Sequence, residues 1–64
     1  SKKDSLIIMN TISRGKVDFS KSNTSLKDCK EYYFEDEDKS KKIWVIIKNC
    51  KNIAEIYDYN ISEK

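Results

Sequence analysis

The stretch Ile43–Cys50, with the sequence IWVIIKNC, is the most apolar run of this 64-residue chain. Its first five residues are all apolar and mostly β-branched, which is typical of a strand that is buried on both faces. It ends at Lys48 and Asn49, a polar pair with turn chemistry. We therefore predict that this run is the central strand of a small β-sheet and that the other segments are arranged around it.

Four further segments have strand-like patterns. They are Leu6–Met9, Ile12–Phe19, Leu26–Glu35, which we predict as a bulged strand, and Ile53–Ile61. The only glycine of the chain, Gly15, lies inside the second segment and predicts a sharp bend there. The last segment also fits a helical stripe after an Asn52 cap, but Tyr57 and Tyr59 favour a strand.

Five short strands in so short a chain predict a mainly β fold, a small five-stranded and strongly bent barrel. Closing the sheet would hide its edges, and a chain of this size has few other residues that could cover them. We expect a single domain over residues 6–61, with a disordered segment at residues 1–5 and a tail at residues 62–64. The block Glu35–Lys42 changes from acidic to basic, which is typical of a solvated hairpin loop between two strands. It lacks the ligand spacing of a Ca²⁺ site.

The charge of the chain argues against several classes of partner. The formal net charge is +2 with a pI near 8.5, which is too weakly basic for non-specific binding to duplex nucleic acid. There is no run of 18 apolar residues and no secretory leader pattern, so we expect no membrane-spanning segment. Local contacts with single-stranded RNA or with a protein segment are compatible with this composition.

The residues usually needed for catalysis or metal binding are scarce. The chain has no histidine, so a general base that titrates near pH 7 and an imidazole partner for a cysteine nucleophile are both missing. Two cysteines are too few for the common structural zinc sites. We therefore predict no catalytic residues, no metal site, no cofactor and no small-molecule substrate.

Cys29 and Cys50 leave two alternatives open. Two buried free thiols are the first, and one disulfide in an oxidising compartment is the second. The glycosylation triplets at Asn23 and Asn60 are compatible with secretion, although such triplets also arise by chance in a chain rich in Asn and Ser.

Several short motifs resemble those of the Sm-like, or LSm, family. Gly15-Lys16-Val17 resembles the bent, glycine-bearing strand of its first motif, and Asn23–Asp28 followed by Glu31 matches the Asn turn and Leu-x-Asp that come next. Val45–Ile56 resembles the apolar, basic and Ile-rich second motif. The departures include Phe19 at the position of the family's aspartate, and they place the chain nearest the divergent LSm domains of decapping enhancers and of the ataxin family.

This resemblance implies an Sm-like or SH3-like barrel and a cytoplasmic, non-catalytic adaptor that binds a partner protein segment in RNA metabolism. Such an adaptor would act in mRNA decay, in P-bodies, or in RNP assembly. One alternative is direct binding of single-stranded RNA in an Sm-like ring, through Asn23, Lys48 and Asn49. The other is a small secreted or viral β-domain with a Cys29–Cys50 bridge. For the adaptor, the expected partner-binding residues are Trp44, Tyr57 and Tyr59, because exposed aromatic side chains anchor protein partners.

Overall fold

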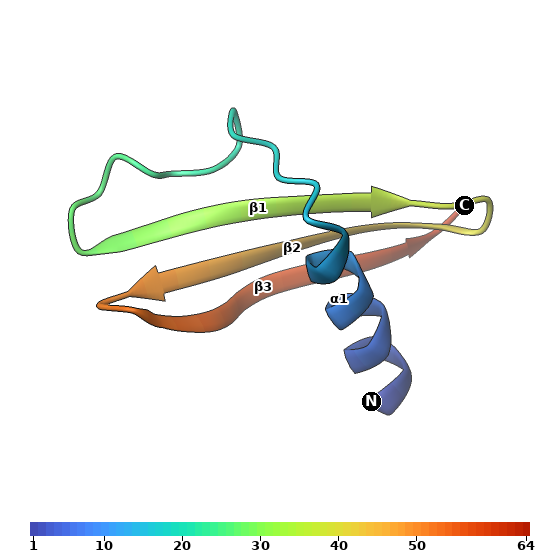
Figure 1. Ribbon diagram of the computed structural model, residues 1–64. Helices are drawn as coiled ribbons and strands as arrows, with labels where there is room; N and C mark the ends of the chain where they lie inside the picture. The colour runs from blue at the N-terminus through green and yellow to red at the C-terminus, as the bar shows by residue number, and fades with distance from the viewer.

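A three-stranded antiparallel sheet with one helix on its surface forms the protein, as the computed structural model describes it over residues 1–64 (Figure 1). The elements are α1 (Lys2–Arg14), β1 (Cys29–Glu37), β2 (Lys41–Cys50) and β3 (Ile53–Glu63). The strand order is β1-β2-β3, so each strand pairs with its neighbour in the sequence. The sheet is a meander with β2 at its centre, as the apolar run in β2 predicts.

The predicted five-stranded bent barrel is wrong. The sheet is open and has three strands, because the two segments predicted as the first strands do not join it. Leu6–Met9 lies within α1, and Ile12–Phe19 contains the end of α1 and a loop. In the segment expected to be disordered, residues 2–5 belong to α1, and β3 continues to Glu63, past the residue at which the tail was expected to begin.

Local signals explain why the N-terminal residues form a helix. The Ser1 side chain accepts a hydrogen bond from the backbone N–H of Asp4, which satisfies one free donor of the first turn. Ile8, Thr11 and Ile12 recur at the helical spacing and place one stripe against the sheet. The helix has 13 residues. Neither its length nor its composition would let it span a bilayer.

The core lies between this stripe of α1 and one face of β2. Its buried apolar residues are Ile8, Ile43 and Val45, which are 5%, 3% and 0% exposed. Partly buried side chains surround them: Ile7, Ile12, Phe34, Ile47 and Ile61. Thr11 is also buried, and its hydroxyl donates to the Ile7 carbonyl at 2.9 Å. Only five residues of the chain are buried, so the core is small for 64 residues.

Two different turns connect the strands. Lys51 and Asn52 join β2 to β3 with positive φ angles of 52° and 67°, the backbone of a type I′ hairpin turn. Between β1 and β2, the Asp38 carboxylate accepts hydrogen bonds from the backbone N–H groups of Ser40 and Lys41, at 2.8 and 2.9 Å. The predicted hairpin loop is therefore shorter than residues 35–42, since β1 continues to Glu37 and β2 begins at Lys41.

The loop between α1 and β1 runs along the outer edge of β1. Isolated bridges join Val17 to Phe34 and Asn23 to Glu31. Between them, the Asp18 N–H donates to the Tyr33 carbonyl at 2.8 Å. This loop covers the β1 edge, whereas no segment of the chain pairs with the outer edge of β3.

Gly15 ends the helix instead of bending a strand. Its φ of 65° and ψ of 26° are left-handed, and its N–H donates to the Ile12 carbonyl. We expect Gly15→Ala to lower the free energy of unfolding by about 1 kcal/mol, because an L-residue is strained in this conformation. Since no atom lies within 4 Å of an added Cβ, the cost is backbone strain alone, and Gly15→Asn should cost less. Urea denaturation of both variants checks this, and equal stability of Gly15→Ala and wild type would contradict it.

Candidate functional site

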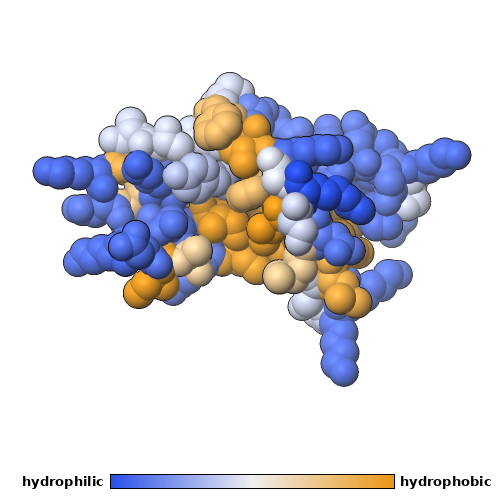
Figure 2. All heavy atoms as spheres, in the orientation of Figure 1, coloured by the Kyte–Doolittle hydropathy of each residue, from blue (hydrophilic) through white to orange (hydrophobic).

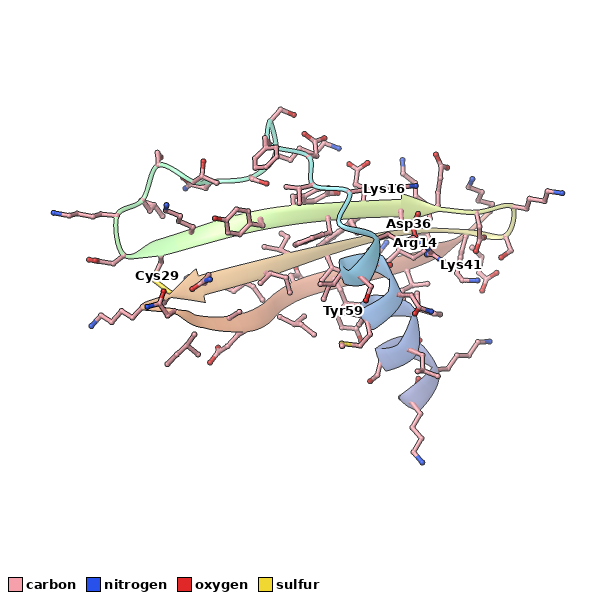
Figure 3. All side chains as sticks on the ribbon, viewed as in Figure 1. Arg14, Lys16, Cys29, Asp36, Lys41 and Tyr59 are labelled. Carbon is pink, nitrogen blue, oxygen red and sulfur yellow. A yellow bond between two sulfur atoms is a disulfide. The ribbon has the colours of Figure 1, made fainter.

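A disulfide between Cys29 and Cys50 closes one end of the sheet (Figure 3). The two residues are directly opposite in the β1–β2 ladder, with their Cα atoms 4.1 Å apart. No free cysteine remains. Of the two alternatives left open by the sequence, the structure contains the disulfide, and the bond ties the ends of two strands that are 21 residues apart in the sequence.

An ion-pair cluster holds α1 to the other end of β1 (Figure 3). Asp36 is 8% exposed and pairs with Arg14 at the end of α1. Its other carboxylate oxygen lies 3.5 Å from the Lys16 Nζ. Burial of Asp36 by itself raises the pKa of this carboxyl, but the hydrogen bonds from Arg14 and from the Glu37 N–H outweigh burial, and the net pKa is lowered.

This cluster makes stability depend on pH in the acid range. A carboxyl whose pKa is lower in the folded state stabilises the fold above its unfolded pKa of about 4, and this contribution is lost as pH falls through the folded pKa. The pKa values of Asp36, Glu37 and Asp38 are all lowered, so their effects add. We expect the midpoint of thermal unfolding to be constant from pH 7 to about pH 5 and to fall below about pH 4. In Asp36→Asn the fall should be smaller, and an equal fall in both proteins would contradict this role of Asp36.

The face of the sheet opposite α1 carries an aromatic pair. Tyr33 and Trp44 stack with ring centroids 5.7 Å apart and an interplanar angle of 21°. The Lys21 Nζ lies 5.1 Å from the centroid of the Tyr33 ring, and burial raises the pKa of the Tyr33 hydroxyl. Trp44 alternates with buried Val45 and is itself half-buried. Trp44 thus packs against a neighbour, and it is less available as a partner anchor than the exposed tyrosines of β3.

The three residues predicted to bind RNA do not converge. Asn23 and Glu31 exchange two backbone hydrogen bonds of 2.8 Å, and Glu31 is opposite Lys48 in the β1–β2 ladder. Glu31 therefore lies between Asn23 and Lys48, where its negative charge repels a phosphate. Asn49 follows Lys48 in β2, so its side chain points to the other face of the sheet. The Lys48 Nζ lies 5.0 Å from the ring centroid of Tyr57.

The strand β3 is the most exposed element of the sheet. None of its 11 residues is buried, although it carries four large apolar or aromatic side chains that are exposed. These are Ile53 (64%), Ile56 (48%), Tyr57 (61%) and Tyr59 (42%). The predicted partner-binding residues Tyr57 and Tyr59 thus lie on an accessible surface, and Ile56 is a neighbour that the sequence interpretation did not select.

Hydrophobic surface also continues from the sheet to the helix. Figure 2 shows a hydrophobic region over the middle of the sheet, beside α1. Leu6 and Met9 of α1 are 66% and 57% exposed and lie three residues apart, on one side of the helix. Sequence reasoning missed them because it placed both in a strand. Leu6 and Met9 are three residues apart and lie outside the core stripe of Ile8 and Thr11. This helical spacing is the signal that identifies them as a second apolar group on the helix.

A cleft beside the loop after α1 is lined mostly by charged side chains. It has a volume of about 470 Å³ and eight lining residues, from the loop after α1 and from the β1–β2 end. Two of its carboxylates, Glu35 and Asp36, are already engaged by Lys21 and Arg14. No three His, Cys, Asp or Glu side chains are grouped so as to hold a metal ion. A comparison of the chain with protein-family models, with curated proteins and with solved structures finds no match.

Proposed function

We propose that this chain is a non-catalytic binding module that recognises a segment of another protein on its sheet. The observation that carries the proposal is the exposure of β3, a strand of 11 residues in which no side chain is buried and only Ile61 is partly buried. Scattered exposed apolar residues are normal on a protein surface, but a contiguous apolar patch usually marks an interaction site. Ile56 and Tyr59 lie next to each other on one face of β3 and give such a patch.

An oxidising compartment is the second part of the proposal. Disulfides persist in secreted, extracellular and periplasmic proteins and are rare where thiols are kept reduced. The Cys29–Cys50 disulfide therefore favours an extracytoplasmic location, and nothing in the structure supports the expected cytoplasmic one. Partner binding is the part of the adaptor role that this surface supports, whereas a role in mRNA decay or RNP assembly depends on the Sm-like resemblance alone.

Direct RNA binding gives a different expectation, which is tested separately. We expect a fluorescently labelled U-rich RNA to show no saturable binding at 150 mM salt, because Glu31 separates Asn23 from Lys48. Fluorescence anisotropy measures this. Saturable binding that is lost in both Asn23→Ala and Lys48→Ala would contradict the expectation and favour the RNA-binding alternative.

Selection from a random peptide library displayed on phage tests the binding-module proposal. The oxidised chain is the bait, and Ile56→Ser and Tyr59→Ser serve as variants of the proposed surface. Leu26→Ser is a matched control, since Leu26 is 45% exposed but lies in the loop before β1. We expect enriched peptides that bind wild type and Leu26→Ser but not the two β3 variants. No enrichment, or peptides that bind all four proteins equally, would contradict the proposal.

A further inference from the structure

We infer that β3 accepts an added β-strand from a protein partner, and that this strand alternates apolar residues with lysine or arginine. The inference depends on the proposed function and specifies its partner and its mode of binding. In this mode, an extended peptide extends the sheet by main-chain hydrogen bonds, and its alternate side chains provide specificity. Three features of the structure support it: the unpaired edge of β3, the side chains beside that edge, and their charge.

The backbone groups at the open edge follow from the register of the sheet. Cys29 and Cys50 form a non-hydrogen-bonded pair of the β1–β2 ladder, because their Cα atoms are only 4.1 Å apart. The backbone N–H and C=O of Cys50 therefore point toward β3, as do those of every second residue of β2 before it. Their β3 partners include Glu55, Asn60 and Ser62, whose backbone groups are therefore hydrogen-bonded to β2. The register shifts between Ile46 and Ile47 of β2, so that Tyr57 is an extra, bulged residue of β3. The backbone groups that point outward belong to Ala54 and Ile56 before this bulge and to Tyr59, Ile61 and Glu63 after it.

None of these outward groups bonds to another backbone group outside the sheet. The Tyr59 N–H instead donates to the carboxylate of the preceding Asp58, at 2.8 Å. This local bond occupies only the Tyr59 N–H. A backbone carbonyl of an incoming strand can replace the Asp58 carboxylate as its acceptor. The open edge of β3 is thus a row of unpaired donors and acceptors, which is the template that strand addition uses.

The side chains next to this edge differ between the two faces of the sheet. Ile61 and Tyr59 lie on the α1 face, because their β2 partners are Ile43 and Val45 of the core. Ile56, opposite Ile47, continues this apolar row. Residues that pair directly across an antiparallel ladder have their side chains on the same face. The partner residues that bond to the edge should therefore be apolar and extend the core surface.

The first turns of α1 lie on the side of the sheet where such a strand would be added. Figure 1 shows that the first turns of α1 extend past β3, so that the N-terminus lies beyond the sheet. These turns carry Leu6, which is 66% exposed, and Met9 follows one turn later. A strand added to β3 would lie next to these turns and give their apolar side chains a surface to pack on.

The charge of β3 indicates which residues alternate with the apolar ones. The strand carries Glu55, Asp58 and Glu63 but no lysine or arginine, so its net charge is −3 in a chain of net charge +2. The rest of the chain therefore carries +5, the difference between +2 and −3. None of the five ion pairs of the structure uses these three carboxylates. Glu55 and Asp58 are on the face away from α1, so lysine or arginine on that side of the partner would pair with them.

The same charges disfavour a second copy of this chain as the occupant. Two β3 strands that pair antiparallel place Glu55 and Asp58 of one copy on the same face as Glu55 and Asp58 of the other, with no cation on either strand. Like charges placed opposite each other destabilise such a ladder and select against it. A cationic partner strand removes this repulsion, which is why we assign the site to another protein.

Two peptides test the inference. The first has the sequence Thr-Lys-Val-Lys-Ile-Lys-Val-Thr, and the second has glutamate in place of each lysine. We expect the lysine peptide to bind the oxidised chain at least tenfold more tightly than the glutamate peptide at 50 mM salt, with the difference reduced at 500 mM. Glu55→Lys in the protein should weaken binding of the lysine peptide, whereas Asp28→Lys, which makes the same charge change in a loop, should change it less than twofold. Equal binding of both peptides would overturn the inference.

N-methylation of the lysine peptide tests strand addition itself. Methyl groups on the amides of Val and Ile should abolish binding, because these amides are the ones that face β3. Methyl groups on the lysine amides should leave binding within about threefold of the parent, since those amides point to solvent. If both methylated peptides bind, or if the chain alone is a dimer with a protected β3 edge, strand addition of this kind is excluded. In the first case the library selection can still succeed, so failure of this inference is distinguishable from failure of the proposed function.

Discussion

Reduction of the Cys29–Cys50 disulfide is expected to lower the free energy of unfolding by about 3 kcal/mol. The bond joins residues that are 21 positions apart, and closing a loop of that length restricts the unfolded chain by about this amount. Urea denaturation with and without a reducing agent measures the difference. The double variant Cys29→Ser/Cys50→Ser should behave like the reduced protein, which separates loss of the bond from side effects of the reductant.

Such a loss is large for this protein because its core is small. Three apolar residues are buried, and a domain of this size has a stability of a few kcal/mol at most without a covalent staple. We therefore expect the reduced chain to be largely unfolded at 37 °C. A reduced protein that keeps its urea midpoint within experimental error would show that the helix and sheet are stable without the bond, and would contradict this role for the disulfide.

Truncation of Ile43 is expected to have the second large effect. Its side chain is 3% exposed and packs with Ile8 and Val45 between α1 and the sheet. Ile43→Ala removes three methyl or methylene carbons from this site and should cost about 3 kcal/mol, from lost burial and from the cavity left behind. Because α1 is held mainly by this cluster and by Asp36, helical circular dichroism should decrease together with stability.

Ile53 offers a matched control for this prediction. The same substitution there, Ile53→Ala, removes the same atoms from a side chain that is 64% exposed at the start of β3. Its effect should be within about 0.5 kcal/mol. Similar costs for the two variants would contradict the assignment of the core to the α1 side of β2.

The centre of the fold could be predicted from the sequence. The run Ile43–Cys50 forms β2 because its consecutive apolar and β-branched residues are suited to a central strand. The strand after it is also predicted correctly, since Tyr57 and Tyr59 favour a strand and the chain continues in one to Glu63. In both segments, local propensity and the tertiary environment agree.

The N-terminal helix was not predicted, for a physical reason. Four consecutive apolar residues, Leu6–Met9, fit a short buried strand and a helix equally well by periodicity. Signals at the ends decide between them: Ser1 caps the first turn and Gly15 supplies the left-handed residue after the last. With this segment in a helix, too few strands remain for a barrel, and the sheet stays open.

The candidate site depends on register and edges, which a sequence specifies only weakly. Cys29 is opposite Cys50 because the short turn at Asp38 fixes the pairing of β1 with β2. Tyr57 and Tyr59 are predicted to bind a partner because of their aromatic character, and this stays a prediction. That they lie on an open edge, beside unpaired carboxylates, follows from the strand order and from the loop that covers the opposite edge.

Amide hydrogen exchange of β3, followed by NMR in the oxidised protein, tests the central claim most directly. The amides that bond to β2, those of Glu55, Asn60 and Ser62, should exchange slowly, and the outward amides of Ala54, Ile56 and Ile61 should exchange fast. Addition of the lysine peptide should slow the second group and leave the first unchanged. Slow exchange of both groups in the free chain would show that the edge is already paired, and fast exchange of both would show that β3 is not part of the sheet; either result would contradict the account.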